Sequence, residues 1–295
     1  MSAPARGPRP LCWAAGWLVL TLLLGGAAGP KAKLTPEEQA RARQSSELLA
    51  RAKQLAAANR YDEALEVAEQ AIQVTPKATA VWRVKGNLLF YAGRAEEALP
   101  AFDRALELAP NSYGAANGKG LALLSLGRYE ESLRYFARNA KRFPKRSAVW
   151  RLKGTAELYG GHLEAALVSF DRATQLTPDY PAPWELRGVT LFELKRYQEA
   201  LESFDRVLEL DHARSNAWMS KASCLVKLNR VEEALPLYDT ALRINPLSAR
   251  ILYSKAEALR LLGRNREARR LYRKAQAIDP DYPGLKESLQ AVSQR

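Results

Sequence analysis

Residues 79–112 read TAVWRVKGNLLFYAGRAEEALPAFDRALELAPNS, and this stretch decides the fold. Apolar residues recur at helical spacing over residues 81–91 and again over residues 95–108. Between these two runs, Gly93 can adopt the left-handed conformation that a tight turn needs. Pro110 follows the second run and ends it, because proline cannot continue a helix. The stretch therefore predicts two antiparallel helices joined by a turn at residues 92–94.

The same pattern recurs every 34 residues along the chain. A column of prolines marks this period: Pro76, Pro110, Pro144, Pro178, Pro246 and Pro280. His212 stands at the one position of the column that lacks proline. A second column holds only small residues: Ala64, Ala98, Ser132, Ala166, Ala200, Ala234, Ala268. A third column is aromatic: Phe102, Phe136, Phe170, Phe204, Tyr238, Tyr272. The columns define seven units without insertion or deletion, 45–78, 79–112, 113–146, 147–180, 181–214, 215–248 and 249–282.

The unit resembles the tetratricopeptide repeat in six of its residues: Trp82, Gly86, Ala98, Phe102, Ala105 and Pro110. The resemblance extends over residues 45–282 and implies an all-α, right-handed superhelical solenoid of antiparallel helix pairs. Departures are few: Leu48, Ala116 and Leu252 stand where Trp is usual, Asn139 replaces a small apolar residue, and His212 replaces Pro. Because one helix pair cannot bury its own apolar face, such units stack and leave a concave surface for partners.

Both ends of the repeat array carry signals for further helix. Thr35 followed by Pro36, Glu37 and Glu38 has the order of cap, proline and acids that opens a helix, so residues 30–44 are interpreted as a linker and an N-terminal helix. Leu285, Leu289 and Val292 lie on one helical face, so residues 283–295 are interpreted as a capping helix.

Residues 1–29 have the features of a targeting segment. Arg6 and Arg9 precede an uncharged run at residues 11–29. The length of this run is intermediate between the apolar segment of a signal peptide and a membrane-spanning helix, which needs about 20 apolar residues. It predicts a signal peptide cut after Ala28 or a signal-anchor helix; a mis-assigned start or an unstructured leader is the remaining alternative. Either targeting form places the repeats outside the cytoplasm. Cleavage would give a secreted, periplasmic or lumenal protein, and an uncleaved anchor would give a single-pass protein that contacts the membrane through residues 11–29.

The residues that usually perform catalysis or bind metal are sparse. His162 and His212 are about 50 residues apart with no cysteine beside either, which disfavours a metal site and histidine catalysis. Cys224 has apolar neighbours and is interpreted as a small core residue. Acid pairs such as Glu96 and Glu97 recur at the start of each second helix, where they complement the helix dipole. The chain is therefore predicted to be no enzyme and to need no cofactor.

One column is basic in every unit: Arg51, Lys85, Lys119, Lys153, Arg187, Lys221 and Lys255. Aspartates stand eighteen residues after four of these positions: Asp103, Asp171, Asp205 and Asp239. This spacing favours ion pairs between the two helices of one unit. The alternative is a basic stripe that binds an acidic peptide, nucleic acid or anionic lipid, although a net charge of +8 over residues 45–282 is modest.

The family resemblance also implies which residues line the partner groove, because the first helix of each unit forms its inner face. The groove candidates are Arg83, Asn87, Phe90, Tyr91, Asn117, Leu124, Arg151, Thr155, Tyr159 and Phe192. Arg83, Asn87 and Asn117 are similar to part of the carboxylate clamp with which some co-chaperone repeats hold an acidic C-terminus. The further basic residues of that clamp are displaced here, so a groove for another extended or helical segment is favoured.

The leading functional interpretation is a non-catalytic scaffold that recruits a protein or peptide partner. A nucleic-acid-binding helical solenoid is one alternative, but it is disfavoured because its usual unit has 35 residues with coding residues at fixed positions. An accessory subunit that positions another protein's active site is the second alternative.

Overall fold

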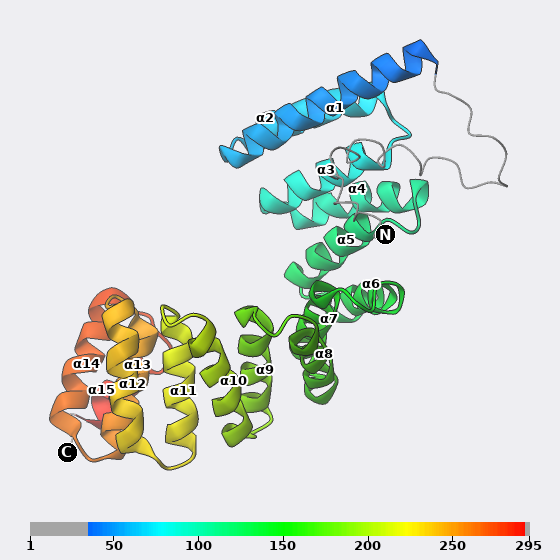
Figure 1. Ribbon diagram of the computed structural model, residues 1–295. Coiled ribbons are helices and arrows are strands. Elements are labelled where there is room, and N and C mark those ends of the chain that lie inside the picture. The colour runs from blue at the N-terminus through cyan, green and yellow to red at the C-terminus, as the bar shows by residue number, and fades with distance from the viewer. Residues whose placement is uncertain (1–34, 293–295) are drawn as a thin grey trace, which may run out of the picture.

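A computed structural model describes residues 35–292, and in this part of the chain all regular structure is helical (Figure 1). The helices are α1 (Pro36–Ala57), α2 (Tyr61–Val74), α3 (Thr79–Tyr91), α4 (Ala95–Leu108), α5 (Tyr113–Ser125), α6 (Tyr129–Arg142), α7 (Ser147–Tyr159), α8 (Leu163–Leu176), α9 (Pro181–Glu193), α10 (Tyr197–Leu210), α11 (Ser215–Lys227), α12 (Val231–Ile244), α13 (Ala249–Leu261), α14 (Asn265–Ile278) and α15 (Leu285–Ala291). They form seven antiparallel pairs and one additional C-terminal helix. The predicted all-α solenoid is confirmed. The predicted targeting segment, residues 1–29, lies outside the described residues.

Contact between an aromatic ring and a small residue holds the helix pairs of units 2 to 7 together, whereas unit 1 has Ala68 at the ring position. A Cβ atom added to Gly86 on α3 would lie 2.8 Å from the ring of Phe102 on α4. The equivalent distance from Gly188 on α9 to Phe204 on α10 is also 2.8 Å, and both rings are buried. Glycine thus lets the ring of the second helix lie directly against the backbone of the first.

The turns between paired helices have a left-handed residue in every unit. Gly93 has φ +79°, and at the equivalent place in unit 5 Lys195 has φ +61°. The other turns have glycine or asparagine at this place, residue types that adopt positive φ readily, whereas Lys195 gives no such signal in the sequence. An arginine follows most of these turns and forms an ion pair with the glutamate three residues later, as Arg94 does with Glu97 at 2.5 Å. This hydrogen-bonded arginine lowers the pKa of Glu97.

In four units a tryptophan connects the first helix to the loop before it: Trp82, Trp150, Trp184 and Trp218. The indole N–H of Trp82 donates to the carbonyl of Pro76 at 2.8 Å, and that of Trp218 donates to the carbonyl of His212 at 3.0 Å. Any residue can supply this carbonyl. This explains why His212 is tolerated where the other units have proline.

The two ends of the solenoid are stabilised by different contacts. Thr35 and Glu38 form a reciprocal capping box, and α1 then runs unbroken through residues 36–57, so the N-terminal extension and the first helix of unit 1 are one helix. At the other end α15 is held by Glu257 of α13, which accepts hydrogen bonds from Tyr272 and from Ser288 of α15. Burial raises the pKa of Glu257, but the hydrogen bonds from Arg260, Tyr272 and Ser288 outweigh burial and leave the pKa below its ordinary value.

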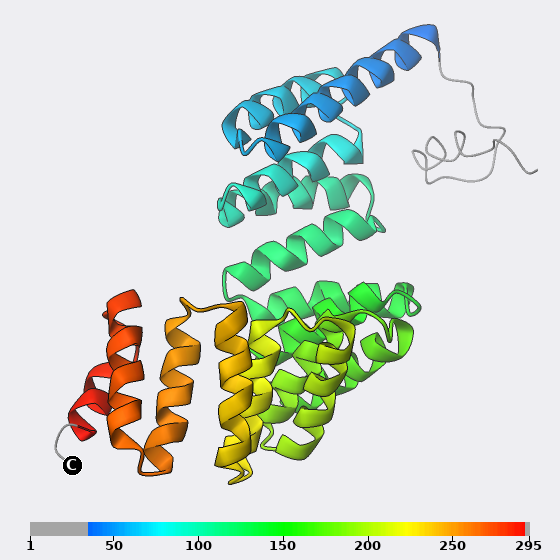
Figure 2. The same ribbon diagram turned by 60° about the vertical axis from the view of Figure 1, so that its left-hand side comes forward.

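The stack curves, and its first helices lie on the inside of the curve. First helices of successive units contact one another at α1–α3, α3–α5, α7–α9, α9–α11 and α11–α13, whereas second helices of successive units do not pack to that extent. In a curved stack, the helices closest to one another are those on the inner side. The exception is α5 and α7, which lie where the stack changes direction (Figures 1 and 2).

Candidate functional site

The candidate site is the inner wall, defined as the exposed parts of the ten groove candidates on α3, α5, α7 and α9. The structure divides them into two groups. Arg83, Asn87, Phe90, Tyr91, Asn117 and Leu124 lie on the contacting helices α3 and α5, whereas Arg151, Thr155, Tyr159 and Phe192 lie on the contacting helices α7 and α9. Because α5 and α7 do not contact each other to the same extent, the wall consists of two segments.

The first wall segment combines an exposed aromatic ring with a free guanidinium group. Tyr91 is 66% exposed and makes an edge contact with Phe90, with 5.5 Å between ring centroids. Arg83 extends over the start of α5, so that a Cβ added to Gly114 would lie 2.8 Å from its Cδ. Within residues 35–292 no carboxylate lies within ion-pair distance of Arg83. Asn117 already accepts a hydrogen bond from Asn139 at 2.7 Å, so its amide oxygen is used within unit 3.

The second wall segment repeats this combination. Tyr159 is 60% exposed and stacks on Tyr129, with 6.0 Å between centroids and 20° between ring planes. Arg151 likewise has no ion pair in the described part of the chain, and its backbone carbonyl accepts a hydrogen bond from Thr155 at 2.8 Å. Phe192 packs its ring against Tyr197, with 5.2 Å between centroids. Tyr159 and Arg151 are therefore the groups of this segment that remain available to a partner.

Three of the ten candidates mainly stabilise the core. Phe90, Leu124 and Phe192 are partly buried and pack against clusters of buried residues. The groove pattern did not distinguish them from exposed side chains, because a first helix turns gradually from the wall into the core. The assignment of the ten residues to a binding site stays a prediction.

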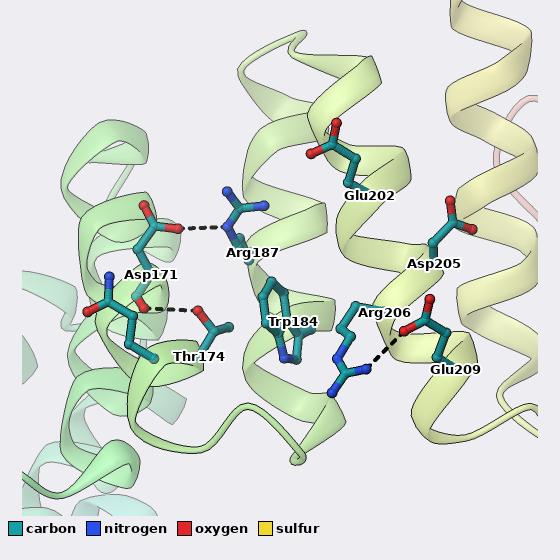
Figure 3. Close-up of a pocket in the computed structure, with 9 residues that line it drawn as sticks. Asp171, Thr174, Trp184, Arg187, Glu202, Asp205, Arg206 and Glu209 are labelled. Carbon is teal, nitrogen blue, oxygen red and sulfur yellow. Dashed lines mark hydrogen bonds and ion pairs between the residues drawn. The ribbon is translucent and has the colours of Figure 1, made fainter.

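A cavity lies on another part of the molecule, among α8, α9 and α10 (Figure 3). Its volume is about 560 Å³, and its lining includes Trp184, Arg187, Glu202 and Arg206. The charges in it are mostly paired: Arg187 Nε lies 2.7 Å from Asp171, and Arg206 lies 2.9 Å from Glu209. A cavity whose charges already satisfy one another offers little to an ionic ligand.

The basic column forms ion pairs, but with different partners from those the sequence favoured. Lys119, Arg187, Lys221 and Lys255 pair with the aspartate sixteen residues earlier, on the second helix of the preceding unit: Asp103, Asp171, Asp205 and Asp239. Lys85 pairs with Glu69 in the same way. The predicted pairs within one unit, eighteen residues apart, were therefore wrong. The column joins neighbouring units instead.

Lys153 is the exception, because the equivalent residue on α6 is Ala137. Its ammonium group donates instead to the buried carboxylate of Glu157 on its own helix and to the Ser169 hydroxyl at 2.9 Å. The Ser169 hydroxyl in turn donates to Glu157 at 2.5 Å. All three groups satisfy one another, so this buried cluster is structural.

The remaining reactive groups are placed unfavourably for chemistry. Cys224 is buried, and burial raises the pKa of its thiol to about 12, so the thiolate form is scarce near neutral pH. His162 contacts Glu130 of the preceding unit at 2.7 Å. Among residues 35–292 no three His, Cys, Asp or Glu side chains are grouped to hold a metal ion, and no helix is long and apolar enough to cross a bilayer.

Six overlapping segments match the model of the tetratricopeptide repeat: residues 49–113, 83–147, 117–181, 151–217, 186–246 and 219–283. The chain belongs to the tetratricopeptide repeat family. This confirms the resemblance on which the sequence interpretation rested. It also supports, in general terms, a protein-interaction scaffold. No curated protein matched this tetratricopeptide repeat chain by sequence.

Solved structures with the same fold are distant in sequence. A tetratricopeptide repeat protein from Parabacteroides merdae is 14% identical with a TM-score of 0.67, covering 85% of this chain and 99% of its own. The Cut9–Hcn1 hetero-tetramer of the APC/C contains a chain 15% identical with a TM-score of 0.67, covering 82% of this chain and 48% of that one. MamA from Desulfovibrio magneticus is 21% identical with a TM-score of 0.54, covering 58% of this chain and 97% of its own. At these identities the likeness extends to the fold alone.

The pairing between units predicts the outcome of two double-mutant cycles. Lys221→Met combined with Asp205→Asn should show a coupling energy of about 0.2–1 kcal/mol, the range for solvent-accessible ion pairs. The control cycle combines Lys221→Met with Asp239→Asn, the partner within the same unit, and should show no coupling. Thermal or urea unfolding measures both cycles. Coupling with Asp239 instead of Asp205 would contradict the observed pairing.

Proposed function

We propose that this chain is a non-catalytic scaffold that binds an extended segment of a partner protein along its inner wall. The observation that carries the proposal is the repeated pairing of an exposed tyrosine with an unpaired arginine on that wall, Tyr91 with Arg83 and Tyr159 with Arg151. Tyrosine and arginine are enriched where binding energy concentrates at protein interfaces. Other arginines without an ion pair among residues 35–292, such as Arg134 and Arg138, lie on a second helix and have no exposed wall tyrosine beside them.

The chemistry of the wall suggests the type of segment. Free guanidinium groups at Arg83 and Arg151 favour carboxylates or backbone carbonyls, and the tyrosine rings favour apolar or aromatic side chains. The two wall segments each supply one such pair, so an extended chain that contacts both must follow the curve of the stack. A partner segment with alternating acidic and apolar residues would fit both segments.

Site-specific photo-crosslinking tests the proposal. A photoreactive phenylalanine analogue placed at Tyr91 or Tyr159 should crosslink to one contiguous segment of a single partner protein in the native host. The matched control is Val168 on the second helix α8, which is 66% exposed, as Tyr91 is. Equal crosslinking from position 168, or crosslinks from the wall to unrelated proteins, would contradict the proposal. For the segment so identified, Tyr91→Ala should weaken binding by more than about 1 kcal/mol, whereas Val168→Ala should not.

We also propose that residues 1–29 direct the repeats out of the cytoplasm. The support is the uncharged apolar run at residues 11–29 after Arg6 and Arg9, with small residues at its end. A cut segment would leave a free extracytoplasmic scaffold, and an uncut one would tether the scaffold to the membrane.

Cell fractionation with N-terminal sequencing decides between these forms. The mature protein should begin at or near Gly29, or the intact chain should be extracted only with detergent. A full-length protein that is freely soluble in the cytoplasm would contradict both forms and leave the scaffold assignment untouched.

A further inference from the structure

The net positive charge of the repeats is concentrated in two units. Unit 3, residues 113–146, has eight basic and two acidic residues, and unit 7, residues 249–282, has nine basic and four acidic. The other five units are each close to neutral. A uniform, solvated excess of charge would not be distributed in this way.

In unit 3 the charge lies on the second helix, α6, where units 2 and 5 have ion pairs. On α4 Arg104 pairs with Glu107 at 2.7 Å, and on α10 Arg206 pairs with Glu209 at 2.9 Å. The equivalent residues on α6 are Arg138 and Lys141, two like charges one turn apart. The aspartate of the inter-unit pairs is also missing from α6, where Ala137 stands in its place. Unit 3 therefore lacks both of the carboxylates that units 2 and 5 have on this face.

The α6 strip, defined as Arg134, Arg138, Lys141 and Lys145, is consequently unpaired. All four side chains are exposed, and within residues 35–292 none has a carboxylate within ion-pair distance. The strip continues into the α6–α7 turn, where Arg146 lies over the ring of Tyr113 at 4.8 Å and leaves its guanidinium edge at the surface. From residue 132 to residue 156 the chain contains eight basic residues and no acidic one.

We propose that the α6 strip is a second docking surface, separate from the inner wall, and that its occupant is an acidic polypeptide segment. Charge complementarity requires a polyanion. The neighbouring second helices select a narrow one, because the one basic residue of α4, Arg104, pairs with Glu107, and α8 has only one basic residue, Arg172. A flat anionic membrane or a stiff nucleic-acid duplex laid across α6 would therefore find basic side chains along α6 and no comparable cluster on α4 or α8.

A flexible chain can follow α6 alone and contact the whole strip. From Arg134 to Lys141 the strip is about 10 Å long, which an extended polypeptide spans with about three residues. Single-stranded nucleic acid is also narrow, but it binds through bases stacked on aromatic rings, and the rings of this unit are already covered: Lys119 lies over Tyr135, and Arg146 lies over Tyr113 and Phe143. A run of aspartates and glutamates therefore fits the strip best.

Fluorescence anisotropy with a labelled peptide of about eight glutamates tests the proposal on the full chain. The wild-type protein should bind this peptide saturably at low salt, release it at about 1 M NaCl, and not bind a polyglutamine peptide of equal length. The triple variant R134Q/R138Q/K141Q should weaken binding about tenfold. Its matched control is R270Q/R273Q/K274Q on α14, which removes the same charge from exposed residues of unit 7 and should weaken binding less than about threefold, because Asp279 and Asp281 flank that helix.

A second variant, Lys141→Glu, restores the residue that α4 and α10 have and should re-form a pair with Arg138 while also weakening peptide binding. Its unchanged melting temperature would show that the loss of binding does not come from loss of fold.

Equal losses in the α6 and α14 triple variants would overturn the proposal, because net charge alone would then account for binding. An oligothymidylate or phosphatidylserine vesicles would overturn the assignment to a polypeptide if they displaced the labelled peptide at a lower concentration of negative charges than unlabelled polyglutamate needs.

Discussion

The structure depends on one contact, repeated along the chain, between an aromatic ring on the second helix and a small residue on the first. In units 2 to 5 the small residue is glycine and the ring is phenylalanine, as with Gly154 and Phe170. In units 6 and 7 alanine replaces glycine, and the ring is a tyrosine whose hydroxyl reaches a polar group of the first helix, as Tyr272 reaches Glu257. Because the ring lies against backbone, the distance between paired helices is set by the ring and not by flexible side chains.

That contact determines what each helix face is free to do. The first helices bury one face against the rings and contact one another along the inside of the curve, which leaves Tyr91 and Tyr159 exposed at their ends. The second helices supply carboxylates to the next unit, as Asp205 does to Lys221. Partner recognition and stacking therefore use different helix faces. On α6 the second-helix face lacks carboxylates, so it does not take part in the ion pairs that join units.

The periodic features of this architecture could be predicted from the sequence, and the choice between neighbouring partners could not. The helix pair of residues 79–112 was predicted to begin at residue 81 and begins at Thr79, and its turn and second helix lie where expected. The basic column was correctly predicted to form ion pairs, but a lysine on a first helix faces second helices on both sides, and spacing alone does not say which carboxylate is nearer. Lys195 shows a similar limit, since its left-handed conformation is imposed by the helices around it and not by its own preference. At the candidate site, the sequence located the face but could not separate exposed Tyr91 from Phe192, which packs into the core.

The most direct test is the sign of the change in the free energy of unfolding caused by one substitution, Gly188→Ala, followed by hydrogen exchange resolved by repeat. Helix propensity alone predicts stabilisation by about 0.5–1 kcal/mol, because alanine favours a helix over glycine. The ring contact predicts net destabilisation of about 1–2 kcal/mol, because the new Cβ would meet the buried ring of Phe204 at 2.8 Å. Exchange should accelerate in α9 and α10 first and fade with distance from unit 5, whereas Gly114→Ala, which meets only the flexible Arg83 side chain, should cost less. Stabilisation by Gly188→Ala, or acceleration spread evenly over all seven units, would contradict the central role of the ring contact.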